Sequence, residues 1–486
     1  MEFALPLASY LEEYRYKYLA IYYAIRDAIL EGRLTSGTKL PSTRYVADLY
    51  HISRGSVAQS YDMLLAEGYV QMTVGKGTFV AHAGPSPDSK KQELVSADIT
   101  LSYWGNRIMS QPRSLKKYVE QDNKISFLLE GMPMESFPYD EWRSALNHAG
   151  GKSGKNLSIA SSPAGDAELR EAIATYLRVT RGISVESSNI VVFSGSMQGI
   201  AILIQLLVNE RDAVVVEDPS YHGIRMGVQA CGGDILRGEL DSDGVIPEDW
   251  NAKVLFVTPS RQFPTGAVLT LERRREILKW AQRHKGVIIE DDYDSEFRFG
   301  GRPIEPLKAL DQEGRVVYLG SFSKTMFAGL RIGYAILPNS LVEPVIQAKA
   351  LYDPITPGLL EQRALAYFMN HGHYKRHLRR MTRVYRVRHD TLCDLMSQHL
   401  SEIFQLVPSD AGLHIYTKWQ RSAEEYEAFI DAAKLRNVEF RDASFYGIFP
   451  GPLAACFGFA HLDEDQMIEG INRLAKAWQD VQQLFE

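Results

Sequence analysis

The sequence predicts a two-part α/β protein, in which a small N-terminal winged helix-turn-helix is joined by a linker to a large domain with a mostly parallel sheet. Residues 84–92, GPSPDSKKQ, have the composition of a linker. They separate a short N-terminal part of the chain from a much longer C-terminal part. Beyond residue 125, short β-branched runs alternate with helical stretches, which is typical of a sheet buried on both faces. We therefore divide the chain into residues 1–82, a linker over 83–124, and residues 125–486.

The composition is that of a globular protein. The chain has 486 residues, 45% of them apolar, and a net charge of −6, so it has no overall attraction to nucleic acid or to a membrane. Three scattered cysteines favour neither a disulfide framework nor a metal cluster and suit a reducing compartment. No run approaches about 18 apolar residues, and the acidic start is unlike a signal peptide. We expect a cytoplasmic protein without a metal site or membrane contact.

Residues 1–82 carry the signals of two short helices followed by a hairpin. A first helix is expected over 14–30, with Gly32 as its stop. Pro41 can open a short helix to about Tyr50, and Ser53 can cap a second helix that ends at Gly68. The strands YVQM and GTFVA follow, joined by TVGK. Helix, turn, helix and hairpin together predict a winged helix-turn-helix.

Such a module reads a DNA groove with the start of its second helix. Here that turn presents Ser53, Arg54 and Ser56, and the hairpin brings Lys76 toward a phosphate. A helical dimerisation module is the alternative. Residues 1–82 hold eight Lys and Arg and eight Asp and Glu, so affinity for DNA would have to come from local placement and from two copies acting together.

In the large domain, polar residues follow the predicted strands NIVVFSG, DAVVVEDP, KVLFVTP, GVIIEDD and RVVYLGS. In an open α/β sheet, ligands bind at these carboxyl ends. Lys324 follows the last strand, and a lysine in apolar company loses its proton readily enough to form a Schiff base. Asp291 could hold a protonated pyridine nitrogen, Tyr293 a ring oxygen, and Tyr221 could stack on the ring. A phosphate could be held by Ser196, Ser321, Ser323 and Arg331.

These groups together are what pyridoxal 5′-phosphate (PLP) requires. Taken singly, each has a plainer interpretation: Lys324 would be an ordinary ion-paired lysine, and EDDYDSEF would be a solvated acidic turn or a metal-binding loop. Their succession at strand ends favours PLP. The complete candidate set for cofactor binding is Lys324, Asp291, Tyr293, Tyr221, Ser196, Met197, Ser321, Ser323 and Arg331.

Two stretches carry a family resemblance. LPSTRYVADLYHISRGSVAQSYDMLLAEGYV resembles the DNA-binding domain of GntR-type bacterial regulators, in which residues matching Arg44, Arg54 and Lys76 contact DNA. From about residue 125 the chain resembles a fold-type I aminotransferase, with Lys324 as the cofactor lysine. The combination, together with TPSRQFPTG and EDDYDSEF, resembles the MocR/GabR family of transcriptional regulators. The resemblance implies a PLP-binding, head-to-tail homodimer that binds a double-stranded DNA operator.

Two departures bear on function. Phe263 stands where aminotransferases usually have the asparagine of Asn-Pro-Thr-Gly, and Cys456, in CFGFAH, stands where relatives have an arginine for the substrate carboxylate. His461 does not supply that arginine either. An unpaired buried carboxylate is costly, so the site is poorly built for an amino-acid effector. We therefore expect a sensor rather than an enzyme, with no residue in a catalytic role.

The favoured hypothesis is a sensor of PLP, similar to the PdxR-type members that control vitamin B6 synthesis genes. Three alternatives stay open. One is a regulator that responds to an amine or amino acid through an external aldimine, whose acid group Arg261 or Arg225 would meet. Another is a working aminotransferase with a DNA-binding appendage. The last is a large domain that serves only as a dimerisation scaffold.

Overall fold

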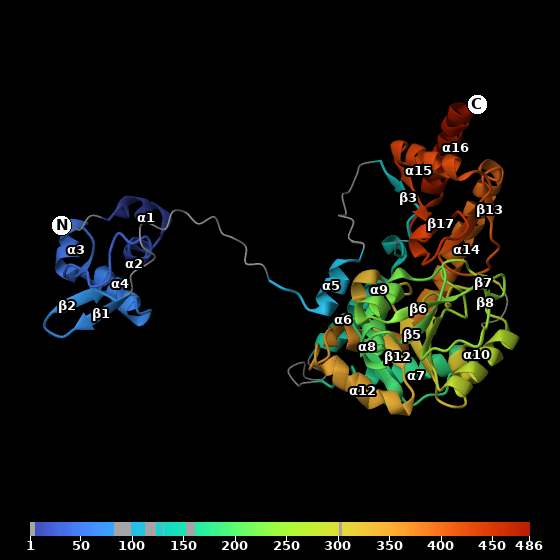
Figure 1. Ribbon diagram of the computed structural model, residues 1–486, viewed down its shortest axis with the longest axis horizontal. Coiled ribbons are helices and arrows are strands. Elements are labelled where there is room, and N and C mark those ends of the chain that lie inside the picture. The colour runs from blue at the N-terminus through green and yellow to red at the C-terminus, as the bar shows by residue number, and fades with distance from the viewer. Residues whose placement is uncertain (1–4, 82–98, 112–122, 130, 152–160, 301–303) are drawn as a thin grey trace. The chain divides into compact units, whose positions relative to one another are not determined.

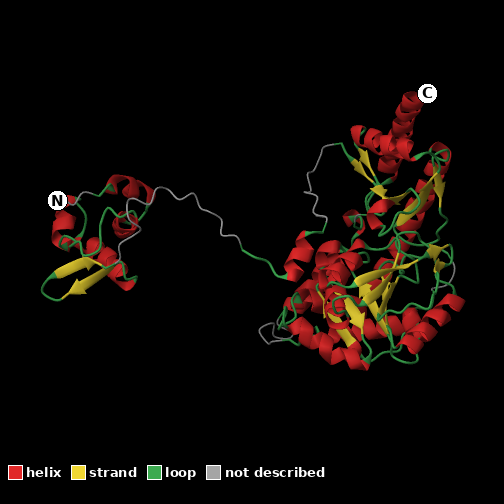
Figure 2. Cartoon of the chain, viewed as in Figure 1, coloured by secondary structure: helices red, strands yellow, loops and turns green. Residues whose placement is uncertain are grey.

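The computed structural model describes residues 5–81, 99–111, 123–129, 131–151, 161–300 and 304–486. The chain forms two compact units, residues 1–100 and residues 101–486, which are coloured along the chain in Figure 1 and by secondary structure in Figure 2. Among the described residues, no helix has both the length and the apolar character that crossing a bilayer requires.

The first unit is a helical bundle with a two-stranded wing. Its elements are α1 (Leu7–Glu13), α2 (Lys17–Leu30), α3 (Thr43–Leu49), α4 (Arg54–Ala66), β1 (Val70–Thr73) and β2 (Gly77–Val80). Ser42 and Ser53 cap α3 and α4 by accepting from the backbone N–H three residues on, as N-cap serines do. The predicted first helix, 14–30, is α2, which begins at Lys17, and α1 is a separate helix before it that was not predicted; the backbone is extended at Tyr14 and Tyr16 between them.

A short helix, α5 (Tyr103–Met109), lies within the predicted linker and packs against α9 (His222–Cys231) of the second unit. Polar contacts hold it: Arg107 Nε donates to the Ala230 carbonyl at 2.9 Å, and Gln111 donates to the Met226 carbonyl at 2.8 Å. Its aromatic residues are not what docks, because Tyr103 is 85% exposed. Residues 82–98 and 112–122 of that linker lie outside the described residues.

A seven-stranded sheet in the order β4-β12-β11-β10-β9-β5-β6 forms the centre of the second unit. Its strands are β4 (Ile190–Phe193), β5 (Ala213–Glu217), β6 (Asp234–Gly238), β9 (Val254–Val257), β10 (Val287–Asp292), β11 (Val316–Ser321) and β12 (Gly333–Ile336). Neighbours pair in parallel except β12, which is antiparallel to both β11 and β4. The carboxyl ends of all strands but β12 therefore share one edge.

Helices cover both faces of this sheet (Figures 1 and 2). On one face pack α8 (Ser196–Leu207), α9 and α12 (Asn339–Ala350), around a core of Val, Ile and Leu from the strands. The other face is covered partly by α10 (Leu271–His284), around Trp280 and Trp250. The helices α6 (Tyr139–Gly150), α7 (Ala167–Arg181) and α13 (Leu359–Asn370) pack together beside it. Short elements complete this part: β7 (Leu240–Asp241), β8 (Gly244–Val245) and α11 (Leu307–Leu310).

A smaller antiparallel sheet, in the order β13-β14-β17-β16, forms the C-terminal part of the unit. Its strands are β13 (Phe404–Leu406), β14 (His414–Trp419), β16 (Arg441–Asp442) and β17 (Ala454–Gly458), and the helices beside them are α14 (His373–His399), α15 (Ala423–Leu435) and α16 (Glu464–Phe485). A parallel pair, β3 (Ile125–Ser126) with β15 (Val438–Glu439), ties the start of this unit to its C-terminal part.

Candidate functional site

The residues predicted to contact DNA lie on the exposed side of the first unit. Ser53 caps α4, and its hydroxyl lies 2.8 Å from that of Ser56. Arg54 begins α4, and its Nε donates to Thr43 of α3 at 3.4 Å. Arg44 of α3 is exposed, as is Lys76 in the turn between β1 and β2. The helix start and the wing therefore present the cations that groove reading needs.

The loop from β4 to α8 forms a cradle at the shared edge of the large sheet. Gly195 has φ +88° and precedes α8, which begins with Ser196 and Met197. A Cβ on Gly195 would lie 2.6 Å from Nη2 of Arg331. Backbone N–H groups at a helix start, together with a guanidinium, bind a phosphate group. A side chain at Gly195 would therefore displace the Arg331 guanidinium and strain the backbone.

Arg331 lies just before β12, the strand that pairs with β4. Its backbone adopts the left-handed conformation, with φ +51°, which is uncommon for residues other than glycine. The guanidinium donates to the Ser194 carbonyl at 3.0 Å. That contact fixes the side chain beside the N-terminus of α8 while the residue stays exposed.

Lys324 lies in the turn after β11, and its Nζ is 3.2 Å from the Leu129 carbonyl. Ser321 ends β11, and its hydroxyl accepts from the backbone N–H of Ser323 at 3.2 Å. The charge of Lys324 acts on the buried carboxyl of Asp294 and lowers its pKa against the larger effect of burial. The lysine therefore lies among the polar groups that follow β10, the neighbouring strand.

Asp291, in β10, is 8% exposed. Burial, with the nearby carboxyls of Asp292 and Glu217, raises its pKa to about 7. Within the described residues its carboxyl has no hydrogen-bond donor, which is rare for a buried acid. The pKa of Tyr221 is raised by burial and then by the charge of Asp291. Asp291 and Tyr221 therefore lie close together, with the acid ready to take a cationic N–H.

Tyr293 follows β10, and its hydroxyl accepts a hydrogen bond from Arg261 Nη1 at 2.7 Å. The same Nη1 lies 3.1 Å from the Asp294 carboxylate, and Nη2 donates to the His414 carbonyl at 2.9 Å. Burial raises the pKa of Tyr293 well above its ordinary value, although the Arg261 charge opposes this. The phenol therefore keeps its proton.

The two departures lie in one apolar wall beside these groups. Phe263 packs edge-on against Tyr293, with the ring centroids 5.4 Å apart. Cys456 is fully buried in β17, in the same cluster as Phe263 and Tyr416. Burial raises the pKa of its thiol, so Cys456 stays neutral. A neutral, apolar wall replaces the amide and the guanidinium that the resemblance would place here.

The two arginines predicted as substitutes are both engaged. Arg261 is saturated by the contacts just described, and Arg225 donates to the Gly447 carbonyl. Sequence reasoning missed a third arginine, Arg441, which pairs with Cys456 across neighbouring strands. Its guanidinium lies 4.8 Å above the Phe445 ring. The pairing of β16 with β17 is tertiary, so no local pattern pointed to it.

Other missed residues surround Arg261. His414 and Ser409 come from the segment near β14, about 150 positions along the chain, and contact Arg261 directly. Gly412 lies over the guanidinium, since a Cβ there would be 2.2 Å from Arg261 Cζ. His414, Ser409 and Gly412 lie in no motif that the sequence analysis identified. Asp294, the carboxylate partner of Arg261, does lie in one, EDDYDSEF.

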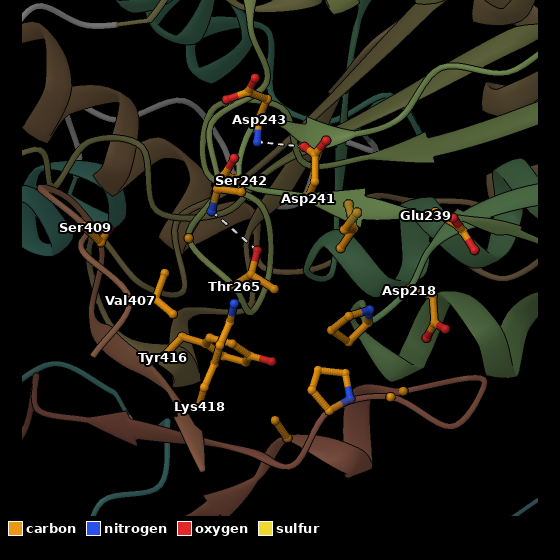
Figure 3. A pocket seen from close by; sticks show the side chains of 18 of the residues that line it. Asp218, Glu239, Asp241, Ser242, Asp243, Thr265, Val407, Ser409, Tyr416 and Lys418 are labelled. Carbon is orange, nitrogen blue, oxygen red and sulfur yellow. Dashed lines mark hydrogen bonds between the residues drawn. The ribbon is translucent and has the colours of Figure 1, made fainter. Parts of the chain in front are cut away.

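A cavity of 1390 Å³ lies beside this wall. Figure 3 shows Asp218, Glu239, Asp241 and Asp243 on one side and Tyr416 and Lys418 on another. Four of its carboxylates are paired: Asp218 and Glu239 both with Arg237, Asp241 with Arg273, and Asp410 with Arg298. Tyr416, which also packs with Phe263 and Cys456, joins this cavity to the wall of the site.

The residues present fit PLP. The donor-free carboxyl of Asp291 suits a protonated ring nitrogen, and the cradle of Gly195, Ser196 and Arg331 suits a phosphate. Lys324 lies at the end of the strand next to that of Asp291. Among the described residues, the candidate cofactor set thus comes together at one edge of the sheet.

Comparison with known proteins agrees with this geometry. Residues 17–80 match the family "Bacterial regulatory proteins, gntR family", and residues 132–474 match "Aminotransferase class I and II". The probable rhizopine catabolism regulatory protein MocR of Rhizobium meliloti is 34% identical over 94% of this chain and 93% of its own. The pyridoxine biosynthesis transcriptional regulator PdxR of Corynebacterium glutamicum is 30% identical over 91% of this chain and 92% of its own.

Solved structures show the fold of the second unit. The kynurenine aminotransferase of Pyrococcus horikoshii, solved with PMP, superposes with a TM-score of 0.70 and 24% identity over 79% of this chain and 95% of its own. The α-aminoadipate aminotransferase LysN of Thermus thermophilus, solved with N-(5′-phosphopyridoxyl)-L-leucine, gives a TM-score of 0.68 and 25% identity over 75% of this chain and 94% of its own.

Proposed function

This chain belongs to the MocR/GabR type of transcriptional regulators, in which a GntR-family helix-turn-helix precedes an aminotransferase-like domain, and we propose that PLP at the second unit controls its binding to an operator. A regulator of this type works on chromosomal DNA, so we place it in the cytoplasm. The head-to-tail homodimer that the family resemblance implies is part of the proposal.

The cofactor is PLP, and each of its parts has a partner in the chain. Asp291 would hold the ring nitrogen, Tyr221 would stack on the ring, and Arg331 with the N-terminus of α8 would hold the phosphate. When bound, PLP supplies an aldehyde to which the Lys324 amine attaches. Because PLP supplies a cation for Asp291, its binding removes the cost of burying that charge.

The wall of Phe263 and Cys456 is the single observation that favours PLP itself as the signal. An acidic effector needs a cation to meet its carboxylate, and the wall offers a phenyl ring and a neutral thiol. Arg261 and Arg225, the expected substitutes, are held by contacts within the protein. PLP needs no such cation. The relative named for pyridoxine biosynthesis adds support, and we propose vitamin B6 synthesis genes as the target.

A second candidate effector is an amino acid, and Arg441 favours it. This arginine lies across from Cys456, and among the described residues it forms no ion pair with a carboxylate. Against it, the guanidinium is already stacked 4.8 Å above the ring of Phe445, which packs against the wall. Turnover of an amino acid stays the weaker possibility, because the asparagine and arginine expected for it are both replaced.

Titration of the full-length protein decides between these effectors. Operator binding is measured by fluorescence anisotropy with PLP alone and with amino acids at millimolar concentration. We expect PLP alone to change the affinity for the operator, and amino acids to change neither that affinity nor the visible absorbance. The Lys324→Ala variant should lose the absorbance band, and Arg441→Gln should respond to PLP as the unmodified protein does.

An amino acid that alters DNA binding while PLP alone does nothing would contradict the proposal. If the Arg441→Gln variant then lost that response, the amino-acid effector would be established instead. Borohydride reduction followed by peptide mapping checks the attachment point, which should be Lys324 and no other lysine.

A further inference from the structure

Among the described residues, the hydroxyl of Tyr293 accepts a hydrogen bond but donates none. Its oxygen accepts from Arg261 at 2.7 Å, and burial keeps its pKa well above the ordinary value, so the proton stays on the oxygen. Within the described residues this proton has no acceptor. Because Tyr293 is half-buried, this proton is available to a ligand oxygen at the site.

Arg261 is held too firmly to be a flexible ligand-binding arginine. It is 3% exposed, and it donates to the Asp294 carboxylate, the His414 carbonyl and the Tyr293 hydroxyl. Nε2 of His414 lies 2.8 Å from the Pro264 carbonyl. A carbonyl can only accept, so Nε2 carries the proton and the lone pair of Nδ1 faces Arg261 at 3.4 Å.

The backbone is also shaped around this guanidinium. Gly412 has φ +89°, and any side chain there would meet Arg261 Cζ at 2.2 Å. Two other chain segments therefore fix Arg261, which lies in the loop after β9: the residues that follow β10 and the segment that leads into β14. A side chain fixed in this way has one orientation to offer Tyr293.

We propose that Arg261 is a positioning residue for the cofactor: by donating to the Tyr293 oxygen, it directs the Tyr293 proton onto the ring oxygen of PLP. The inference rests on the proposed function, since it requires that PLP occupy this site. It explains how the chain manages with Phe263 where an asparagine would give the second donor. The Tyr293 hydroxyl, oriented and polarised by the charge of Arg261, donates a stronger hydrogen bond and so compensates for the missing second donor.

This arrangement makes a prediction about the proton shared between the lysine-linked cofactor and its ring oxygen. A strong hydrogen bond donated to the ring oxygen lowers the affinity of that oxygen for the shared proton. The proton is then lost at a lower pH. The positive charge of Arg261 acts in the same direction. Removing Arg261 therefore raises the pH at which the visible band titrates. The other charged and titratable groups around the site include Asp291, Asp292, Asp294, Lys324, His414, Cys456, Tyr221 and Arg331.

The test is a double-variant cycle on the full-length protein loaded with PLP. The visible band is titrated with pH for the unmodified protein, Arg261→Gln, Tyr293→Phe and the double variant. We expect Arg261→Gln to raise the midpoint by about one pH unit and to weaken PLP binding about tenfold, the loss of one charge-assisted hydrogen bond. Tyr293→Phe should do the same, and the double variant should add little, because both changes remove one interaction.

Two further variants guard against a merely structural effect. Arg261→Gln leaves Asp294 buried and unpaired, so an Arg261→Gln, Asp294→Asn variant removes both charges and should fold, yet still shift the midpoint. Arg225→Gln is the matched control, since this arginine donates to the Gly447 carbonyl and, among the described residues, makes no hydrogen bond to Tyr293 or Arg261; its midpoint should stay unchanged. Arg261→Lys keeps the charge without the planar fork and should recover part of the shift.

The outcomes separate this inference from the proposed function. If the unmodified protein shows no visible band with PLP, both fail. If the band forms but Arg261→Gln titrates as the unmodified protein does, the positioning role of Arg261 is overturned while PLP binding stands. Shifts from Arg261→Gln and Tyr293→Phe that add in full would also overturn it, since Arg261 would then act by its charge alone.

Discussion

Replacing Asp291 with asparagine should stabilise the ligand-free protein while it abolishes cofactor binding. Burial raises the pKa of this carboxyl from 3.8 to about 7. One pKa unit corresponds to about 1.4 kcal/mol, so the ionised carboxyl costs at most about 4 kcal/mol at pH 8. Below pH 4 the group is protonated in both the folded and the unfolded state and contributes nothing. The cost therefore grows as the pH rises from about 4 to 7 and is constant above that.

Urea unfolding of the ligand-free protein, followed by tryptophan fluorescence, measures this difference. All six tryptophans lie at or beyond residue 104, so the signal reports the second unit alone. The gain in unfolding free energy of Asp291→Asn over the unmodified protein should be near zero at pH 4 and largest at pH 8. The exposed Asp234→Asn change should show no such trend. Equal stability at pH 8, or PLP binding that survives in Asp291→Asn, would refute the reasoning.

Three further outcomes follow from the geometry. Gly195→Ala should weaken PLP binding without Lys324 being touched, because the new methyl group meets Arg331 at 2.6 Å; an unchanged dissociation constant would contradict the cradle. Arg54→Ala should cost about 1–3 kcal/mol of operator binding and relax specificity if Arg54 reads a base, whereas Lys76→Ala should weaken binding to all sequences alike. The isolated residues 1–81 should bind an operator weakly, since avidity needs two copies; tight binding by this monomer would count against it.

Much of the fold was readable from the sequence because its signals are local. Pro41 marked the start of α3, and Ser53 and Gly68 marked the two ends of α4. The β-branched runs became strands of one sheet. The fold-type I architecture and the GntR-type head are confirmed by the family matches. The helix α1 was not predicted, because at seven residues it is too short to show a clear helical period.

The site was predictable only as far as the strand ends. Motifs that follow parallel strands must meet at one edge, and this rule brought Asp291, Lys324 and Arg331 together from the sequence. The neighbours of Arg261 follow no such rule. His414 and Gly412 reach it through the packing of the C-terminal sheet against the large one, a tertiary contact that leaves no period in the sequence. The sequence offered Arg261 as a partner for the carboxylate of an amino-acid effector. It could not show that Tyr293, Asp294 and His414 already occupy the guanidinium.

Cys456 has a consequence for how this regulator could change its specificity over time. Cys456 is fully buried and neutral, so a charged residue at this position would be costly unless an anion paired with it. A single substitution, Cys456→Arg, would place a guanidinium in the wall beside Phe263, close to Arg441 on the adjoining strand. That one step would favour carboxylate-bearing ligands over PLP alone. Folding and ligand preference would then be coupled at this one position, because a carboxylate ligand would offset the burial of the new guanidinium.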